Sequence, residues 1–406
     1  MPSVTVRPSR SLRLPAPGRR GAFSLHASVL VALLAASSAP TPVYALYQAA
    51  WHFSAMTLTV VFSAYALALL VALLTAGTLS DHLGRRPVLA GALLVQGVAM
   101  IAFATAEGVP ALIAARILQG LATGVATSAA GAALLDFEDP DRPGRATVAN
   151  GITPVAGMAA GVLAATALVQ YAPAPTRTVY LLLILLFAAQ AGAVLLTGET
   201  VRPTAGALRS LRPTIRLAPA ARPAMAVAAP GIVAAWALGG FYSSLGPSLA
   251  RLIAPHAAPA TGGLVFFTLT AAAGLAGHGA RSLLARTVSL AGSALLIPGA
   301  LLTLSSPQLH SLAALFTGTA LAGAGFGAVT QSTLRLLLPA AAPAERAGTL
   351  AAYYVLSYLA MSIPTVLAGL LTNVYGLQTA VVVYATTVIA LTLYSLARTA
   401  RLPRTA

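Results

Sequence analysis

The chain has 406 residues, of which 58% are apolar and only 8% are charged, and its mean hydropathy is +0.85. A soluble globular protein carries about 25% charged residues, so this composition excludes an ordinary water-soluble fold and predicts a protein that spans a lipid bilayer. The sequence contains no cysteine, which excludes a disulfide framework, a thiolate metal site and a thiol nucleophile. Its six histidines lie far apart, without HExxH or HxxxH spacing, so we expect no bound metal and no cofactor.

Twelve apolar windows follow one another along the chain, each about as long as the roughly 20 residues that a transmembrane helix needs. They cover about 23–47, 55–79, 87–106, 109–135, 146–170, 178–198, 226–250, 261–280, 285–305, 310–336, 347–372 and 378–397. The sequence therefore predicts an all-α polytopic membrane protein built as two six-helix bundles. In chain order, the predicted parts are a basic cytoplasmic tail (1–22), the N-terminal six-helix bundle (23–198), a polar cytoplasmic linker (199–225), the C-terminal six-helix bundle (226–397) and a second cytoplasmic tail (398–406).

The basic residues predict the orientation in the membrane. All 24 are arginines, and the net charge of +16 would favour nucleic-acid binding in a soluble protein. If the N-terminus is cytoplasmic, 21 arginines fall in cytoplasmic tails and loops, two (Arg177 and Arg251) fall in outer loops, and Arg116 alone lies inside a window. The positive-inside rule then places both termini in the cytoplasm, in a multi-pass protein of the cytoplasmic (inner) membrane. We therefore expect the lipid bilayer, and no nucleic acid, as the macromolecular partner.

The start of the chain allows a second interpretation. An arginine-rich leader followed by the apolar stretch 25–39 also resembles a cleaved signal peptide. The window runs on through Pro40 to Tyr47 without a break, and it has a counterpart half a chain later, which favours a first transmembrane helix. At an offset of 201 residues, Arg85 aligns with Arg286, a weak internal repeat of the kind found in transporters.

One loop carries a recognisable pattern. The segment after the second window reads GTLSDHLGRR, from Gly77 to Arg86. Gly77 permits close helix approach, Gly84 allows a tight turn, and Asp81 can accept a charge-assisted hydrogen bond from Arg85 or Arg86. A basic turn that serves only membrane topology is the alternative.

This segment resembles the G-x-L-[AS]-D-x-x-G-R-[KR] signature of the major facilitator superfamily at every defined position, in the expected loop between the second and third helices. The resemblance implies a transporter in which two halves alternate in opening a central site to either side of the membrane. It also implies that the segment, with Asp81, Gly84 and Arg85 at its centre, acts as a conformational latch against the other half.

The fourth window contains RILQG from Arg116 to Gly120, which resembles the R-x-x-Q-G element of the same superfamily. An arginine inside a span is costly unless it finds a partner or water, and such residues usually face the bundle interior. Snorkelling of the side chain to the outer interface is the alternative. The resemblance implies that Arg116 and Gln119 take part in ion coupling, which predicts proton coupling, while Gly120 also suits close helix packing.

Two further windows bear on the direction of transport. The first contains ASSAPTPVYALYQ at 36–48, which resembles a segment of bacterial efflux permeases. The fifth contains NGITPVAGMAAG at 150–161, which keeps a proline and several glycines of the antiporter pattern in a different order. The first resemblance favours efflux, and the departure in the fifth window weakens the antiporter assignment.

The interior of the predicted bundles is neutral. All eight acidic residues fall in or beside loops, which opposes a deep carboxylate site for a cation. Aromatic and uncharged polar groups remain, and we predict a substrate cavity lined by Tyr44, Asn150, Trp236, Tyr242, Gln331, Tyr354 and Tyr358. Three other tyrosines are predicted to be anchors at the membrane interface: Tyr47, Tyr171 and Tyr375.

These observations predict a secondary transporter, expected to act as a monomer, for small-molecule substrates. Proton-coupled export of hydrophobic or amphiphilic compounds is the first hypothesis, and import or facilitated passage of a neutral metabolite is the alternative. A membrane-embedded enzyme needs positioned acids, bases or metal ligands, and the spans offer none, so we expect no enzyme.

Overall fold

The computed structural model describes residues 18–213, 215–342 and 345–401. Within these ranges the chain forms α-helices and short 3-10 turns, and no strand. Twelve helical segments there are long and apolar enough to cross a membrane, which confirms the predicted all-α polytopic fold. Most of the predicted tail 1–22 and of the tail 398–406 lies outside the described residues.

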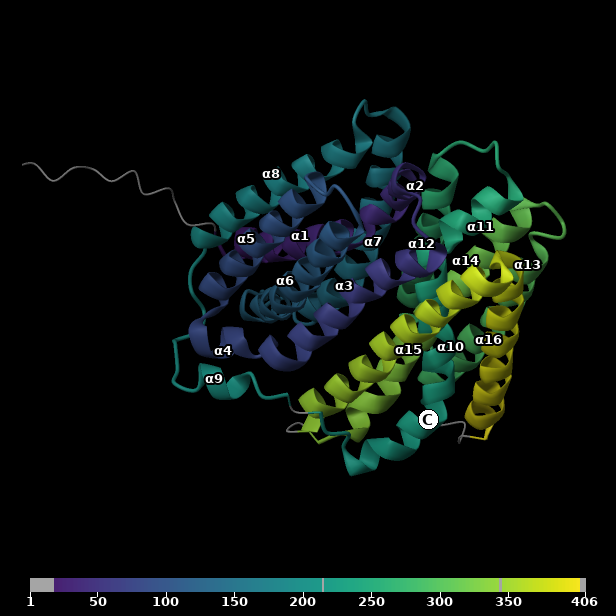
Figure 1. Cartoon of the computed structure of the whole chain (residues 1–406). Coiled ribbons are helices and arrows are strands. Elements are labelled where there is room, and N and C mark those ends of the chain that lie inside the picture. The colour runs from purple at the N-terminus through teal and green to yellow at the C-terminus, as the bar shows by residue number, and fades with distance from the viewer. Residues whose placement is uncertain (1–17, 214, 343–344, 402–406) are drawn as a thin grey trace, which may run out of the picture.

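The N-terminal half packs around its own core. Its helices are α1 (Arg19–Ser38), α2 (Pro40–Trp51), α3 (Ala55–Ala76), α4 (Leu79–Leu83), α5 (Arg85–Ala104), α6 (Val109–Asp136), α7 (Arg145–Tyr171) and α8 (Pro175–Leu195). One contiguous apolar cluster, from Val29 to Val194, fills the space between them. In Figure 1 these helices, coloured purple to teal, lie together on one side of the molecule.

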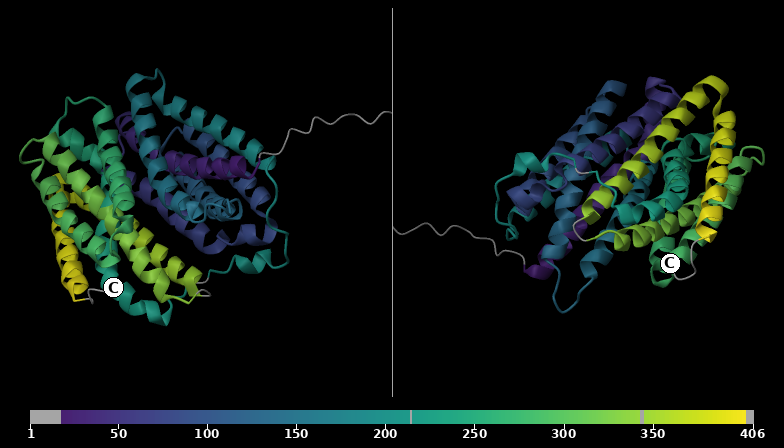
Figure 2. Two further views of the ribbon diagram at one scale, coloured as in Figure 1. Left: turned by 180° about the vertical axis from the view of Figure 1, so that it is seen from behind. Right: turned by 90° about the horizontal axis from the view of Figure 1, so that it is seen from below.

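The C-terminal half repeats this arrangement with a separate core. Its helices are α10 (Arg222–Ser244), α11 (Gly246–Ile253), α12 (Ala260–Gly279), α13 (Ala285–Ser305), α14 (Leu312–Ala340), α15 (Arg346–Tyr375) and α16 (Leu377–Ala400). Two apolar clusters hold this half together, and only Val162 of α7 joins them as a buried residue from the other half. Both views of Figure 2 show the green and yellow helices as a second bundle beside the first.

Several spanning helices begin at the same end of the molecule with an arginine at their first or second position, namely α1, α5, α7, α10, α13 and α15. We call this the arginine-rich end. The segment between α8 and α10 runs along it and contains α9 (Ala207–Ser210) and a short 3-10 turn (Pro219–Ala221). This segment contacts the loop after α3, since the backbone N–H of Thr204 donates to the His82 carbonyl over 2.8 Å.

The first spanning helix is broken, although its apolar window is continuous. The helix ends at Ser38 and restarts at Pro40 as α2. Proline has no N–H to donate to the carbonyl four residues earlier, and its ring clashes with that carbonyl. Pro40 therefore leaves the Ala36 carbonyl, and Pro42 the Ser38 carbonyl, without their helical donors.

The two halves are held together mainly at the end opposite the arginine-rich end. Hydrogen bonds between helices of the two halves, among the described residues, join Met56 to Asn373 (3.3 Å), Ser63 to Ser362 (3.4 Å) and Gln48 to Arg251 (3.0 Å). The first two link α3 to α15, which lie side by side in Figure 1. These contacts extend from the opposite end of the bundle to its middle.

Candidate functional site

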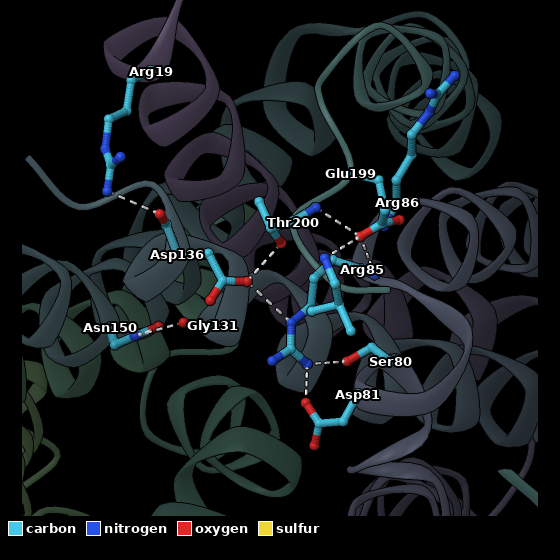
Figure 3. Close-up of polar contacts among 11 residues, drawn as sticks. Arg19, Ser80, Asp81, Arg85, Arg86, Gly131, Asp136, Asn150, Glu199 and Thr200 are labelled. Atoms are coloured by element: carbon cyan, nitrogen blue, oxygen red, sulfur yellow. Dashed lines mark hydrogen bonds and ion pairs between the residues drawn. The ribbon is translucent and has the colours of Figure 1, made fainter. Parts of the chain in front are cut away.

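Arg85 is the centre of a polar network at the arginine-rich end (Figure 3). Its Nη1 donates to Asp81 and, over 2.7 Å, to Ser80 Oγ, both on α4. Its Nε donates to Asp136 Oδ2 at the end of α6, over 3.3 Å. The guanidinium, 14% exposed, therefore bridges two carboxylates that lie far apart in the sequence.

Glu199 closes the same network from the segment after α8. Its carboxylate accepts the backbone N–H groups of Arg85 (2.9 Å) and Arg86 (3.0 Å), the first two residues of α5. The first N–H groups of a helix have no partner within the helix, and a negative charge there is favourable. Sequence reasoning placed Glu199 only near a loop. An acid in a loop that is otherwise basic is the sequence feature from which its role could have been predicted.

Gly84 precedes α5 and makes this contact sterically feasible. Its φ is +100°, a conformation that side chains rarely adopt. A Cβ at this position would lie 2.6 Å from Glu199 Oε2. Two features of the structure therefore require a glycine at position 84: the positive φ of the turn and the close approach of the Glu199 carboxylate.

The other members of the predicted latch motif differ in their surroundings. Gly77 follows the last residue of α3, where a Cβ would lie 2.5 Å from the Leu73 carbonyl oxygen. The Arg86 side chain extends away from Asp81 and Asp136 in Figure 3. The contacts of Asp81, Arg85 and Glu199 all lie within the N-terminal half and the segment after it.

Arg116 forms a second polar cluster, inside the N-terminal half. Its side chain is 1% exposed, so the predicted alternative of snorkelling to the interface is wrong. Nε donates to the Tyr44 hydroxyl, and Nη1 donates to the Ser37 carbonyl (3.1 Å) and to Gln119 Oε1 (2.6 Å). The guanidinium carbon also lies 5.2 Å from the ring centre of Tyr65 and 5.3 Å from that of Tyr44, within the range of cation–π attraction.

The break in the first helix supplies the acceptors of this cluster. The Ala36 carbonyl, which Pro40 cannot satisfy, accepts the Gln119 amide over 2.9 Å. The next carbonyl, of Ser37, is one of the acceptors for Arg116. No carboxylate lies within ion-pair distance of this guanidinium in the described part of the chain. Carbonyl dipoles, a phenol and aromatic rings therefore stabilise the buried charge.

Gly120 brings α6 against α3. A Cβ there would lie 2.4 Å from the Tyr65 carbonyl oxygen and 2.8 Å from Ala68 Cβ. Contacts this short do not occur in real structures, so the two helices approach this closely only with a glycine at position 120. Gly120 thereby fixes the distance between Arg116 and the Tyr65 ring.

The residues predicted to line a cavity are divided among several places. Tyr44 belongs to the Arg116 cluster, and Asn150 donates to the Gly131 carbonyl (3.1 Å) between α7 and α6. Trp236 and Tyr358 lie 5.3 Å apart by ring centres, and Tyr354 lies 6.1 Å from Tyr358.

Two tyrosines are placed differently from the prediction. Tyr242 is fully buried in the C-terminal core, where its hydroxyl pairs with Thr303 of α13, so it does not fit a cavity shared by the halves. Tyr47 is 4% exposed and stacks on Trp51, so it is not an interface anchor, because helix packing has covered it. Tyr171 and Tyr375, 84% and 66% exposed, lie on the surface as expected.

The family assignment follows from the sequence and agrees with this geometry. A family model described as the Major Facilitator Superfamily matches residues 27–363. The chain belongs to the Major Facilitator Superfamily. The resemblance based on the loop after α3 is therefore confirmed, and so is the prediction that the protein is a transporter and not an enzyme.

Solved structures of other transporters share the fold. A bacterial homologue of the human lysosomal transporter Spinster, in an inward-facing and unoccupied conformation, superposes with a TM-score of 0.74 at 11% identity, over 95% of this chain and 97% of that one. The human organic anion transporter MFSD10 superposes with a TM-score of 0.65 at 17% identity, over 93% of this chain and 100% of that one. The nucleoside transporter NupG superposes with a TM-score of 0.71 at 11% identity, over 94% of this chain and 100% of that one. At such identities the likeness concerns the fold alone, and no curated protein matches the chain.

Proposed function

We propose that the protein exports small hydrophobic or amphiphilic organic compounds across the cytoplasmic membrane in exchange for protons. In this proposal the arginine-rich end and both termini face the cytoplasm, following the positive-inside rule, and the protein acts as a monomer. The two halves rock about a site near the middle of the membrane and expose it to each side in turn.

The observation that carries the proposal is the buried Arg116 cluster. A guanidinium that is 1% exposed in a membrane span is expensive, and residues of this kind usually serve an ion or substrate pathway. Its partners Ser37 and Tyr44 lie on either side of the break between α1 and α2. A change in the protonation or hydration of the cluster would therefore act directly on the geometry of the first spanning helix.

The network around Arg85 supplies the conformational latch of this proposal. Arg85 joins Asp81 to Asp136, and Glu199 ties the start of α5 to the end of α8. In our proposal these contacts hold the loop from Gly77 to Arg86 in the position from which it acts as a latch against the C-terminal half. Asp81 and Asp136 at this end, and Glu107 at the other, are the carboxylates available to carry protons.

Import or facilitated passage of a neutral metabolite is the second candidate. It is favoured by one observation: the acidic residues lie at or beyond the ends of the spanning helices, so no span in the described chain places a carboxylate near its middle. Such a carboxylate is the simplest proton carrier in a membrane protein. Uncoupled passage needs none.

Accumulation of fluorescent amphiphiles in efflux-deficient cells tests the proposal. Cells that express the chain should accumulate less than cells with an empty vector, and a protonophore should abolish the difference. The Asp81→Asn variant should reach the membrane at the same level and export markedly less. Equal export by this variant at equal expression would contradict the latch role, and no effect across the panel would favour the metabolite carrier.

A further inference from the structure

Four aromatic side chains in the C-terminal half form a surface that we call the aromatic patch: Trp236, Phe326, Tyr354 and Tyr358. Trp236 of α10 lies 5.4 Å from Phe326 and 5.3 Å from Tyr358 by ring centres, with interplanar angles of 64° and 58°. None of these rings stacks in parallel on a neighbour in the patch, and all four are partly exposed. The four rings therefore do not cover one another completely, and part of each residue stays accessible.

The aromatic patch is turned toward the N-terminal half. Tyr354, Tyr358 and Ser362 follow one another at intervals of four residues on α15, so they share one helix face. The Ser362 carbonyl accepts a hydrogen bond from Ser63 of α3. The same face thus meets the other half at Ser362 and carries Tyr354 and Tyr358 farther toward the arginine-rich end.

Beside the patch lies a group of polar side-chain atoms without partners. The Tyr353 hydroxyl and Ser357 Oγ, on residues that are 1% and 0% exposed, have no hydrogen-bond partner of good geometry; the nearest polar groups to the Tyr353 hydroxyl are those of Trp236, Ser357 and Thr330. Trp236 Nε1, Thr330 Oγ1 and Gln331 Oε1 are likewise buried and unpaired, so three helices contribute to the group. Leaving a buried polar atom unpaired is energetically unfavourable, and most such atoms in proteins are satisfied.

Burial alone does not leave hydroxyls unpaired in this half. Tyr384 is also buried, and its hydroxyl donates to the Ala237 carbonyl over 2.7 Å. Tyr242 is buried and pairs with Thr303. Single unpaired atoms also occur elsewhere in this half, at Ser293 and Ser362. Five unpaired side chains (Trp236, Thr330, Gln331, Tyr353 and Ser357) lie on the three helices that carry the patch.

The charges near the patch define the ligand further. The acidic residues lie at or beyond the ends of the spanning helices, and the buried Arg116 binds its own partners in the other half. A charged ligand at the patch would lose its hydration without gaining a counter-ion. An uncharged one would meet aromatic faces and unpaired hydrogen-bonding atoms.

We propose that the aromatic patch and the adjacent polar atoms bind the transported solute, and that this solute is an uncharged, planar aromatic molecule with at least one hydrogen-bonding group. The assignment rests on the proposed function in taking the chain as a carrier of organic solutes, and it names the substrate class. The rings hold the flat part of the solute. Tyr353, Ser357 and Trp236 pair with its polar group.

The two tryptophans of the chain, Trp51 and Trp236, allow a direct binding test. In a Trp51→Phe variant in lipid nanodiscs, Trp236 is the only tryptophan, and 2-naphthol should quench its fluorescence in a saturable way. Decahydro-2-naphthol has the same carbon skeleton and hydroxyl without aromaticity, and it should displace 2-naphthol only at concentrations at least tenfold higher. Equal potency of the two compounds would overturn the assignment.

The hydrogen-bonding part has its own matched variants. Tyr353→Phe should lower the affinity for 2-naphthol about tenfold, the loss expected for one hydrogen bond. The affinity for 2-methylnaphthalene, which has no hydroxyl, should stay unchanged. Tyr384→Phe, which removes the same atom from a paired tyrosine, should leave both ligands unchanged. If Tyr353→Phe does not purify as a folded protein, Ser357→Ala takes its place with the same expectation. Equal affinities for 2-naphthol in the test and control variants would refute the polar anchor.

This test is independent of coupling and direction, because it measures binding without a gradient. Selective binding in a protein that shows no proton-driven export would leave the assignment standing and contradict the proposed function. Proton-driven export of amphiphiles, with no preference for 2-naphthol over decahydro-2-naphthol in binding, would support the proposed function and contradict the assignment of the aromatic patch.

Discussion

The contact between Gly84 and Glu199 makes the effect of Gly84→Ala calculable from the structure. Alanine would have to adopt a φ near the +100° of Gly84, in a region that costs a side chain about 1–3 kcal/mol. Its Cβ would also lie 2.6 Å from Glu199 Oε2 and displace the carboxylate that caps α5, and loss of such a cap costs about 1 kcal/mol. We expect Gly84→Ala to destabilise the protein by about 2–4 kcal/mol, with loss of export.

Gly91→Ala is the matched control, because a Cβ at this exposed position of α5 meets nothing within 4 Å. Alanine stabilises a helix interior by roughly 0.5–1 kcal/mol relative to glycine, so the control should be neutral or slightly more stable. The apparent melting temperatures of both detergent-purified variants measure the difference. The cost of Gly84→Ala should shrink in a Glu199→Ala background, where no carboxylate is displaced. A Gly84→Ala protein as stable and active as the Gly91→Ala protein would refute the reasoning.

Three other substitutions test the remaining contacts. Arg116→Lys keeps the positive charge but cannot reproduce the fork of donors, so proton-driven export should fall at least about tenfold in a folded protein; export at the normal rate would remove Arg116 from coupling. Gly120→Val should lower stability by about 1–3 kcal/mol through overpacking against α3, and an unchanged melting temperature would contradict the close approach. Glu199→Gln removes the charge at the start of α5 and should cost about 0.3–1 kcal/mol in low salt and less in high salt, and a salt-independent effect would argue against a role for the charge.

Much of the fold is predictable because the bilayer imposes simple rules on the sequence. Twelve apolar windows of the right length appear in the structure as twelve spanning segments. The break at Ala39 was not predicted, since hydropathy does not register that Pro40 removes a hydrogen bond from the Ala36 carbonyl. That local defect turned out to matter, because the carbonyls around it accept hydrogen bonds from Gln119 and Arg116.

The candidate site was predictable only in part, for a different reason. A motif contiguous in sequence, such as 77–86, brings its own partners close together, so the pairing of Asp81 with Arg85 was foreseeable. Glu199 reaches this motif only through the fold. Residue type likewise indicates that tyrosines occupy the interior, but only packing places Tyr242 inside one half and turns Tyr358 toward the other.

The central claim is that solute moves outward in exchange for protons, and proteoliposomes test it most directly. A gradient of a transported amphiphile, imposed across vesicles that contain an entrapped pH indicator, should drive protons in the opposite direction. Proton movement that requires the protein and is lost in the Arg116→Lys variant is the predicted result. Movement of the amphiphile down its gradient with no change in the internal pH would contradict the account and identify an uncoupled carrier.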